Sequence, residues 1–264
     1  MTLYTLFGNP VAHSLSPRMH NLAFARLGIQ GAYMRSLLED GERLREVFFA
    51  LKLNGANVTV PHKEAAFRAC DKVLGIATSI KAVNTLINDN GVLVGYNTDA
   101  PGFLRAIASF KTVRSALILG AGGTAKALAY ALRETGIAPT ILNRSAPKLE
   151  AFQKDGFACF THETFSLTPF DLIINTTSAG LSDNALPASK AVLEALFTHA
   201  SYVFEVIYKP TPFLALASAH GLTCKDGKEM LLWQGVLAFN LFHHNTLAEE
   251  TIATAMQEAL RLSS

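Results

Sequence analysis

The stretch SALILGAGGTA, residues 115–125, decides the fold. Its first five residues predict a buried strand, and the Ala- and Leu-rich segment after the glycines predicts a helix from Gly123 to Glu134. Within this GxGxxA pattern, Gly120 permits a tight turn, Gly122 lets the backbone approach a pyrophosphate, and Ala125 lets helix and strand pack closely. Free amides at the start of the helix attract phosphate. The stretch therefore predicts a dinucleotide site, with a ligand-free glycine turn as the alternative.

The end of the next predicted strand indicates which dinucleotide binds. Enzymes that use NAD commonly place an acidic residue on the ribose about 20 residues after the first glycine. Here the chain has Asn143, Arg144 and Ser145, and no acid. The amide of Asn143 does not repel a phosphate, and the guanidinium of Arg144 pairs with one, so these residues favour NADP over NAD. Lys148 either adds positive charge or is simply solvated.

Outward from this stretch, short apolar runs alternate with helical segments, which is typical of parallel βαβ architecture. In the second half, the predicted strands span 115–119, 140–143, 171–176 and 202–207, and the predicted helices span 123–134, 146–154 and 211–220. In the first third, the predicted strands span 2–7, 32–38 and 56–60, the predicted helices span 17–27 and 41–53, and Asn90-Gly91 predicts a hairpin between 83–88 and 92–96. Three more helices are predicted over 99–110, 228–244 and 247–262.

We therefore expect an α/β protein of two domains. Residues 1–101 with 235–264 would form an N-terminal α/β substrate-binding and catalytic domain with a mainly parallel sheet. Residues 102–234 would form a Rossmann-like NADP-binding domain. No strand is predicted between the last two helices, so they would pack back on the first domain rather than extend the second sheet.

Composition limits the kind of partner. The chain has 264 residues, half of them hydrophobic and 17% charged, and a formal net charge of +2 without a run of like charges. Such a chain folds into a substantial core and lacks the basic surface that nucleic acid or anionic membranes require. Cys70, Cys159 and Cys224 lie far apart without CxxC spacing, which argues against disulfides and zinc. We expect a small-molecule partner, no metal, no nucleic acid and no membrane, and a cytoplasmic monomer or homodimer.

Polar side chains gather at the ends of the predicted strands of the first domain. Thr59 and Lys63 follow one strand, where open α/β folds bind ligands. Asn84 precedes the hairpin, and Asp99 follows it, where its carboxylate would also cap the next helix. Ser14 and Ser16 lie in a turn before the first helix. Hydroxyls and amides in such number suit a compact, polyhydroxylated ligand, because each buried ligand hydroxyl needs a fixed partner.

Taken together and in order, these motifs resemble the shikimate dehydrogenase family over essentially the whole chain. The matching segments are Gly8-Asn9-Pro10, His13 to Pro17, His20-Asn21, Asn57 to Lys63, Ala82 to Thr85, Gly95 to Asp99, Gly120 to Ala125, Asn143 to Ser145, and Asp226 to Gln234. The resemblance implies an NADP-dependent oxidoreductase that reversibly reduces 3-dehydroshikimate to shikimate, on the route to chorismate and the aromatic amino acids. The family commonly has an aspartate where this chain has Glu205.

The resemblance also implies roles for individual residues. Lys63 and Asp99 would form the catalytic pair. The implied substrate contacts are Ser14, Ser16, Thr59, Lys63, Asn84, Asp99, Tyr208 and Gln234. The implied cofactor contacts are Gly120, Ala121, Gly122, Gly123, Thr124, Asn143, Arg144, Ser145, Lys148, Val206 and Gly227.

Two alternatives stay open. One is a quinate/shikimate dehydrogenase of relaxed specificity, because quinate differs from shikimate by little more than a ring hydroxyl; Arg144 argues against NAD as its cofactor. The other is a nucleotide-sensing regulator on the same fold. Retention of both Lys63 and Asp99 argues for catalysis, since a sensor needs only binding groups.

Overall fold

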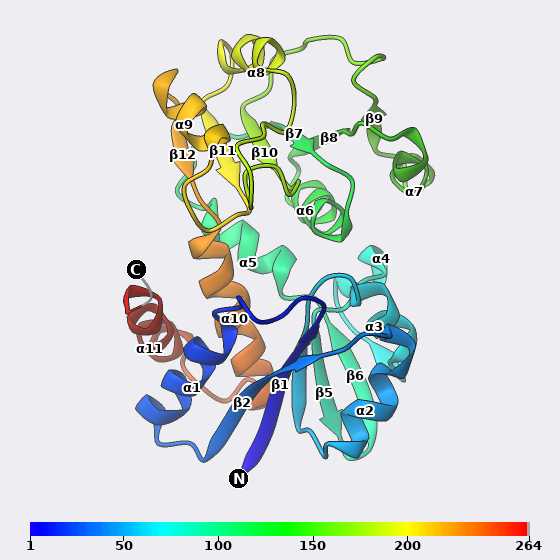
Figure 1. Ribbon diagram of the computed structural model, residues 1–264, viewed down its shortest axis with the longest axis vertical. Helices are drawn as coiled ribbons and strands as arrows, with labels where there is room; N and C mark the ends of the chain where they lie inside the picture. Colours follow the sequence, from blue (N-terminus) through cyan, green and yellow to red (C-terminus); the bar gives the residue numbers. More distant parts are fainter. Residues whose placement is uncertain (263–264) are drawn as a thin grey trace. The chain divides into compact units, whose positions relative to one another are not determined.

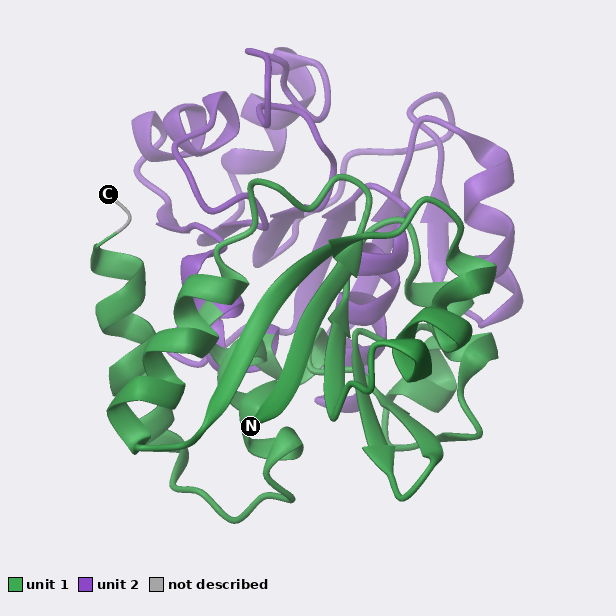
Figure 2. Cartoon of the chain, turned by 60° about the horizontal axis from the view of Figure 1, so that its bottom comes forward, with its two compact units in different colours: residues 1–102, 232–264 green, residues 103–231 purple. Residues whose placement is uncertain are grey.

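The computed structural model describes residues 1–262, and these form two compact units. Unit 1 comprises Met1–Gly102 and the chain from Leu232 onward, and unit 2 comprises Phe103–Leu231 (Figure 2). The chain thus changes unit after residues 102 and 231, where the sequence predicted changes after residues 101 and 234. Within residues 1–262, no helix is long and apolar enough to cross a membrane.

Unit 1 contains a six-stranded mixed sheet (Figure 1). Its strands are β1 (Thr2–Gly8), β2 (Gly31–Leu37), β3 (Gly55–Val58), β4 (Lys72–Val73), β5 (Thr85–Asp89) and β6 (Val92–Tyr96), in the order β2-β1-β3-β5-β6-β4. β1 pairs in parallel with β2 and β3, and β4 pairs in parallel with β6. β5 runs antiparallel to β3 and β6. Asn90 and Gly91 both have positive φ, as the predicted hairpin turn requires.

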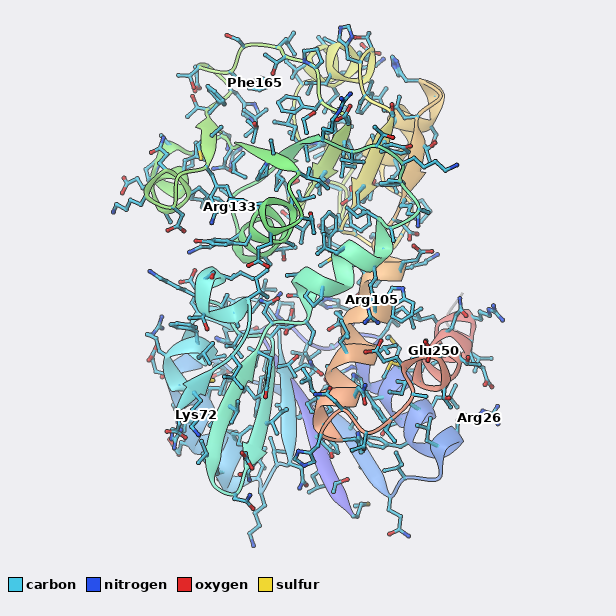
Figure 3. All side chains as sticks on the ribbon, turned by 180° about the vertical axis from the view of Figure 1, so that it is seen from behind. Arg26, Lys72, Arg105, Arg133, Phe165 and Glu250 are labelled. Atoms are coloured by element: carbon cyan, nitrogen blue, oxygen red, sulfur yellow. The ribbon has the colours of Figure 1, made fainter. Side chains whose placement is uncertain are left out.

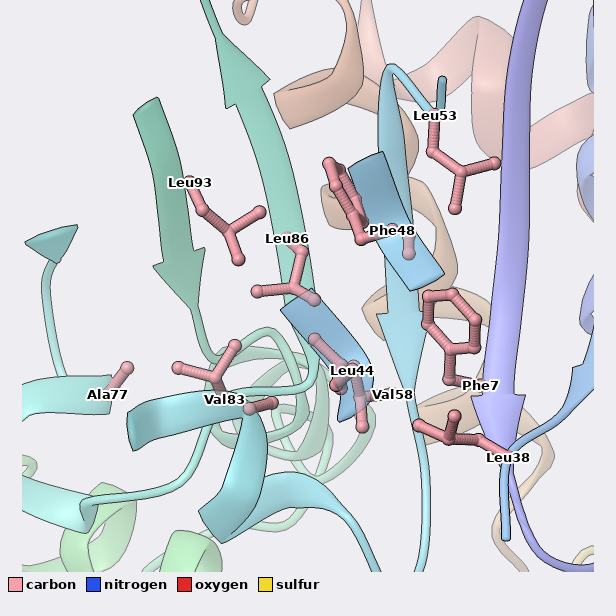
Figure 4. Close-up of a cluster of buried hydrophobic side chains, with 12 residues drawn as sticks. Phe7, Leu38, Leu44, Phe48, Leu53, Val58, Ala77, Val83, Leu86 and Leu93 are labelled. Carbon is pink, nitrogen blue, oxygen red and sulfur yellow. The ribbon is translucent and has the colours of Figure 1, made fainter. Parts of the chain in front are cut away.

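The helices of unit 1 cover both faces of this sheet. They are α1 (Ser16–Leu27), α2 (Leu44–Ala50), α3 (Lys63–Ala69), α4 (Ala77–Ile80), the first part of α5 (Asp99–Ala106), most of α10 (Lys228–Phe242), and α11 (Glu249–Arg261). On one face, Phe48 of α2 packs in a core with Phe7 and Leu86 (Figure 4). On the other, Tyr4 of β1 stacks on Phe242 of α10 at 4.7 Å between ring centroids.

Helix α11 and most of α10 belong to unit 1, so the C-terminal helices pack on the first unit, as the sequence predicted. Helix α11 lies along α1, and its buried face consists of Ile252, Ala255, Met256 and Ala259 (Figure 1). An exposed ion pair between Arg26 and Glu258 joins the two helices.

Unit 2 contains a second six-stranded sheet, and all its strands are parallel. The strands are β7 (Ser115–Leu119), β8 (Ala138–Leu142), β9 (Ala158–Phe160), β10 (Leu172–Asn175), β11 (Tyr202–Glu205) and β12 (Thr223–Lys225), in the order β12-β11-β10-β7-β8-β9. Its helices are α6 (Gly123–Glu134), α7 (Glu150–Lys154), α8 (Lys190–Phe197) and α9 (Pro212–Ala219). Arg133 of α6 is labelled in Figure 3. Its Cζ lies 4.6 Å from the ring centroid of Tyr130 and 4.0 Å from that of Phe157.

The predicted α/β class with a Rossmann-like unit is confirmed, but several local predictions are wrong. The helix predicted over 146–154 begins as a 3₁₀ turn, Ala146–Leu149, and only Glu150–Lys154 is α-helical. The helix predicted over 41–53 is a 3₁₀ turn, Gly41–Arg43, followed by α2, which ends at Ala50. The sequence interpretation missed the short elements β4, β9, β12 and α4, and also α8. Asp99 does not cap α5, because Asn97 Oδ1 accepts the bond from the Ala100 amide (3.2 Å) and the Asp99 carboxylate has other partners.

Candidate active site

An ion pair between Lys63 and Asp99 forms the centre of the polar cluster in unit 1. Lys63 Nζ donates to Asp99 Oδ2 at 2.6 Å, and the two side chains are only 14% and 11% exposed. Lys63 is the first residue of α3, and Asp99 is the first residue of α5. The Lys63 carbonyl accepts a bond from the Val83 amide (2.9 Å), which ties the start of α3 to the segment before the hairpin. Two residues 36 positions apart are therefore held in direct contact.

Asn84 fixes the other oxygen of the Asp99 carboxylate. Its Nδ2 donates to Asp99 Oδ1 at 2.9 Å, while its Oδ1 accepts from the Thr98 amide at 2.7 Å. Since an amide N–H only donates, the bond from Thr98 identifies the oxygen of the Asn84 side chain and turns its nitrogen toward Asp99. The antiparallel register that pairs Thr85 with Tyr96 brings Asn84 beside residues 97–99. Both carboxylate oxygens of Asp99 therefore accept hydrogen bonds from fixed donors.

A buried chain of hydrogen bonds continues from Asn84 into the sheet. Thr85 Oγ1 donates to Asn84 Oδ1 (3.0 Å) and accepts from Asn57 Nδ2 (3.0 Å). Asn57 Oδ1 in turn accepts from the Tyr33 hydroxyl (2.8 Å). These bonds link Tyr33 to Asp99 through Asn57, Thr85 and Asn84.

Tyr33 is held by the two consecutive residues His20 and Asn21 of α1. Asn21 bonds both the amide and the carbonyl of Tyr33, each at 2.9 Å. The His20 ring stacks on the Tyr33 ring at 4.2 Å between centroids. His20 is completely buried, and neither of its ring nitrogens has a hydrogen-bond partner. Burial lowers the pKa of His20 to about 3, so its ring is neutral at physiological pH.

The predicted serines lie in the turn before α1. Ser14 Oγ and Ser16 Oγ are 3.3 Å apart, and Ser16 also donates its amide to Ser14 Oγ (3.2 Å). No side-chain oxygen caps the start of α1, so the amides of its first turn add positive potential near both hydroxyls. The Arg35 guanidinium bonds the Ser14 carbonyl at 2.6 Å and fixes this turn.

Thr59 and Gln234 are placed by close contacts with glycines of unit 1. A Cβ on Gly8 would lie 2.3 Å from Thr59 Cγ2, so only glycine fits where β1 ends against the turn after β3. A Cβ on Gly102 would lie 2.8 Å from the Gln234 amide nitrogen, which brings α10 against α5 close to Asp99. Unit 1 thus carries seven of the eight predicted substrate contacts, and Tyr208 belongs to unit 2.

A cavity of about 490 Å³ in unit 2 lies at the glycine turn after β7. Gly120 has φ +109°, and a Cβ there would lie 2.7 Å from Thr176 Oγ1. Gly122 and Gly123 face open space, because a Cβ on either would meet nothing within 4 Å. No side chain caps the start of α6, so its first amides remain available to an anion. This geometry fits a pyrophosphate.

Basic side chains also line the same cavity. Arg144 and Lys148 are exposed, and neither has a described hydrogen bond or ion pair. Asn143 donates through Nδ2 to the Ser145 carbonyl (2.9 Å), which closes the turn that presents Arg144. A cavity with unpaired cations fits a phosphorylated ligand better than a neutral one.

The sequence interpretation missed part of this cavity. Its lining also contains His162, Thr176, Thr177, Ser178, Ala179, Asp183, Leu142, Ala185, Leu186 and Pro187. Thr176 and Thr177 follow β10 directly, so the rule that places ligands at the carboxyl ends of parallel strands could have found them. His162 follows β9, a strand too short to be recognised.

Val206 and Gly227, both predicted cofactor contacts, lie together but do not line this cavity. A Cβ on Gly227 would lie 2.1 Å from the Val206 carbonyl oxygen, so only glycine allows this approach. Gly123, Thr124 and Ser145 also lie outside the cavity lining; Gly123 and Ser145 directly follow lining residues. Within residues 1–262, no three His, Cys, Asp or Glu side chains are placed to hold a metal, and the three cysteines are free thiols.

The two units carry different functional groups. Unit 2 offers phosphate-binding amides and cations beside a parallel sheet, while unit 1 offers a Lys–Asp pair among hydroxyls and amides. This combination is typical of a dinucleotide-dependent dehydrogenase.

Comparison with known proteins gives the family. Residues 6–86 match the family described as shikimate dehydrogenase substrate binding domain, and residues 116–198 match the one described as ketopantoate reductase PanE/ApbA. The chain is 47% identical to shikimate dehydrogenase (NADP(+)) of Helicobacter hepaticus, covering 97% of this chain and 98% of the relative. It is 46% identical to the enzyme of the same name from one strain of Helicobacter pylori, covering 90% and 91%.

Among solved structures, one similar to this chain is shikimate 5-dehydrogenase from Thermus thermophilus in complex with NADP(H) and shikimate. The TM-score is 0.83 at 36% sequence identity, with 98% of this chain and 100% of the other covered. This chain belongs to the shikimate dehydrogenase family, as its sequence motifs indicated.

Proposed function

We propose that this protein catalyses the reversible NADP-dependent reduction of 3-dehydroshikimate to shikimate, a step on the route to chorismate and the aromatic amino acids. The observation that carries the proposal is the Lys63–Asp99 pair, buried and joined at 2.6 Å amid hydroxyls and amides. The names of the relatives from Helicobacter hepaticus and Helicobacter pylori support the same activity and the same cofactor.

The residues of the cavity in unit 2 fit NADP. The turn from Gly120 to Thr124 and the first amides of α6 would hold the pyrophosphate. Arg144 and Lys148 would pair with the 2′-phosphate, beside Asn143 and Ser145. The chemistry that NADP supplies when bound is hydride transfer.

The chain's own contribution to that chemistry is proton transfer. When an alcohol becomes a ketone its hydroxyl proton must leave, and in the reverse direction the developing alkoxide must receive one. Lys63 Nζ is the group assigned to take and return this proton. Asp99 holds Lys63 through Oδ2 and would accept a hydrogen bond from a neighbouring substrate hydroxyl, while Asn84 keeps the carboxylate in place.

Substrate recognition is assigned to neutral donors. The hydroxyls of Ser14 and Ser16 would bind the substrate carboxylate, assisted by the first amides of α1. Thr59, Asn84 and Gln234 of unit 1, and Tyr208 of unit 2, complete the proposed set of contacts. Burial raises the pKa of Tyr208, so its hydroxyl stays protonated and available as a donor at neutral pH.

An assay of NADPH absorbance with the purified protein tests the proposal. We expect turnover with shikimate and NADP, and at least tenfold lower kcat/KM with quinate or with NAD. NAD lacks the 2′-phosphate and so loses charge-assisted bonds, and the additional hydroxyl of quinate would be buried without a partner; each costs roughly tenfold or more. Equal turnover of quinate would replace this function by the relaxed specificity, and binding of NADP without turnover of either acid would favour a sensor. The cytoplasmic location and the monomeric or homodimeric state stay predictions from the sequence.

A further inference from the structure

Glu205, the last residue of β11, is a buried ionisable side chain that the proposed chemistry does not use. It is completely inaccessible to solvent and lies outside the cavity lining. A buried carboxyl group without a counter-charge is costly, so its contacts need a physical explanation.

Neutral hydrogen-bond donors surround the Glu205 carboxylate. Oε2 accepts from Asn175 Nδ2 (2.8 Å) and from Thr211 Oγ1 (3.2 Å), and Oε1 accepts from the Ile207 amide (3.1 Å). These partners come from β10, from the start of α9 and from Glu205's own segment, and all are neutral. Two of them, the Asn175 nitrogen and the Ile207 amide, can only donate. The site is therefore built for a carboxylate.

Through Asn175, the hydrogen bonds of Glu205 extend to the cavity. With its nitrogen turned to Glu205, Asn175 must present its Oδ1 on the opposite side. That oxygen accepts from both the amide (2.9 Å) and the hydroxyl (2.8 Å) of Thr177, which lines the cavity. The orientation of Thr177 thus depends on the carboxylate two hydrogen bonds away.

The other hydrogen bonds of Glu205 hold the segment after β11. The Ile207 amide and the Thr211 hydroxyl both donate to Glu205, and Thr211 also caps α9 by accepting from the Leu214 amide (3.3 Å). Residues 206–211 include Val206 and Tyr208. One carboxylate therefore ties the loop after β10 to the loop after β11.

We propose that Glu205 is a positioning residue of the cofactor site, whose carboxylate orients Asn175 and, through it, Thr177 for NADP binding. This inference rests on the proposed function, because it assigns the cavity to NADP. A glutamine at this position would turn an N–H toward Asn175, Ile207 or Thr211. At the first two it would oppose a second donor, so the arrangement could not form unchanged.

Protonation of Glu205 would have a similar effect. Burial raises the pKa of Glu205 to about 7, although hydrogen bonding from Asn175, Ile207, Thr211 and the Val206 backbone opposes the shift. The described groups facing it from β10, α9 and its own strand are the neutral ones named above. The fraction of protein with an ionised Glu205 therefore changes between pH 6 and pH 8, and NADP affinity should follow that fraction.

Calorimetric titration of NADP into the substrate-free protein tests the inference. The proteins are wild type, Glu205→Gln, and Glu134→Gln as a control that removes an exposed carboxylate of the same unit. At pH 8 we expect Glu205→Gln to bind NADP about tenfold more weakly than wild type, and Glu134→Gln to match wild type. At pH 6 the difference should shrink severalfold, because wild type has itself lost most of the carboxylate.

The pH comparison separates positioning from a merely structural role. The 2′-phosphate of NADP also titrates in this range, but it is the same in all the measurements and cancels in the ratio of affinities. Shikimate affinity, measured by the same method, should change less than about twofold. If Glu205→Gln does not fold, Thr177→Val removes the receiving end of the relay and should weaken NADP binding severalfold.

Two outcomes would overturn the inference alone. One is NADP binding by Glu205→Gln equal to wild type across pH 6–8, and the other is an equal loss of NADP and shikimate affinity. A wild-type protein that binds no NADP would overturn the proposed function, and this inference with it.

Discussion

Charged side chains are paired with each other in the polar cluster of unit 1, whereas the arginine and the lysine of the cavity in unit 2 have no described ion pair. In unit 1, Lys63 and Asp99 form an ion pair with each other, and both side chains are nearly buried. In unit 2, Arg144 and Lys148 line the cavity, are exposed to solvent, and have no described hydrogen bond or ion pair. Proton transfer needs groups held in a fixed relative orientation, which internal partners supply. Cofactor binding needs charges kept free for the ligand's own phosphates.

A second contrast concerns the buried ionisable side chain that supports each site. In unit 1, completely buried His20 packs under Tyr33, and its pKa is lowered to about 3. In unit 2, completely buried Glu205 holds Asn175, and its pKa is raised to about 7. Burial favours the neutral form of both groups, yet the neutral form is the free base for histidine and the acid for glutamate. As pH changes, these two side chains should therefore change the free energy of unfolding in opposite directions.

The largest effect is expected from removing the amine that carries the proton. Lys63→Ala should lower kcat by roughly 10²-fold or more, the usual scale of general acid–base catalysis, with smaller changes in the KM for shikimate and in NADP affinity. Lys72→Ala on β4, an exposed lysine of the same unit, is the control and should leave kcat unchanged (Figure 3). Wild-type kcat in folded Lys63→Ala would remove Lys63 from the chemistry.

The matching change in unit 2 removes an unpaired cation from the cavity. Arg144→Ala should lower the ratio of kcat/KM for NADP to that for NAD by about ten- to a hundredfold, since charge-assisted bonds to a phosphate contribute about 1.5–3 kcal/mol. Arg114→Ala, another exposed arginine of unit 2, serves as the control. An unchanged ratio would show that cofactor preference lies elsewhere.

The opposite pH responses can be measured as unfolding free energies in urea. His20 is neutral in the fold and charged in the unfolded chain below pH 6.5, so its contribution is complete above pH 6.5 and is lost as pH falls toward 3. Between pH 7.5 and pH 5 wild type should lose about 2 kcal/mol relative to His20→Phe, which does not titrate.

For Glu205, the change in the free energy of unfolding with pH has the opposite sign. Its pKa is raised from 4.5 to about 7, so the cost of burying the carboxylate is complete above pH 7 and disappears as pH falls toward 4.5. From pH 7.5 to pH 5 wild type should gain about 2 kcal/mol relative to Glu205→Gln. The same sign of change for both pairs would contradict the assignment of one neutral base and one raised acid.

The smallest effect is expected at the far end of the relay in unit 1. Tyr33→Phe removes the hydroxyl that orients Asn57 and leaves Asn57 Oδ1 without its donor. We expect kcat to fall by about three- to tenfold, the scale of one neutral hydrogen bond, while NADP affinity is unchanged. Tyr96→Phe, whose hydroxyl has no described bond, is the matched control. A Tyr33→Phe enzyme as fast as Tyr96→Phe would show that the relay does not position Asp99.

Much of the fold could be predicted because local and global signals agree. The strand Ser115–Leu119 and the helix Gly123–Glu134 were predicted with the bounds that the structure has, since an apolar run, a glycine turn and a helix-forming segment follow one another. Helix α8 was missed although Ser189 caps it by accepting from the Val192 amide. The edge strands β9 and β12 have three residues each, too few to show a periodicity.

The site was predictable where side chains stand at strand ends, and less so where tertiary contacts assign the role. The pattern brought Lys63 and Asp99 into one cluster but gave Asp99 the cap that Asn97 supplies. Nothing local marks Tyr33, because its function depends on Asn57, 24 residues away. Glu205 reads as the end of a buried strand, and only the bonds from Asn175 and Thr211 show why an acid stands there.

The most direct test of the central claim, that Lys63 and Asp99 act as one unit, is a double-mutant cycle on kcat/KM for shikimate. The variants are Lys63→Met, Asp99→Asn and the double variant, each checked for folding by thermal melting. Because Asp99 acts by holding Lys63, the double variant should be no more than about threefold slower than the slower single variant. Losses that multiply, so that the double variant falls by the product of the two single effects, would show that the residues act independently and would contradict the account.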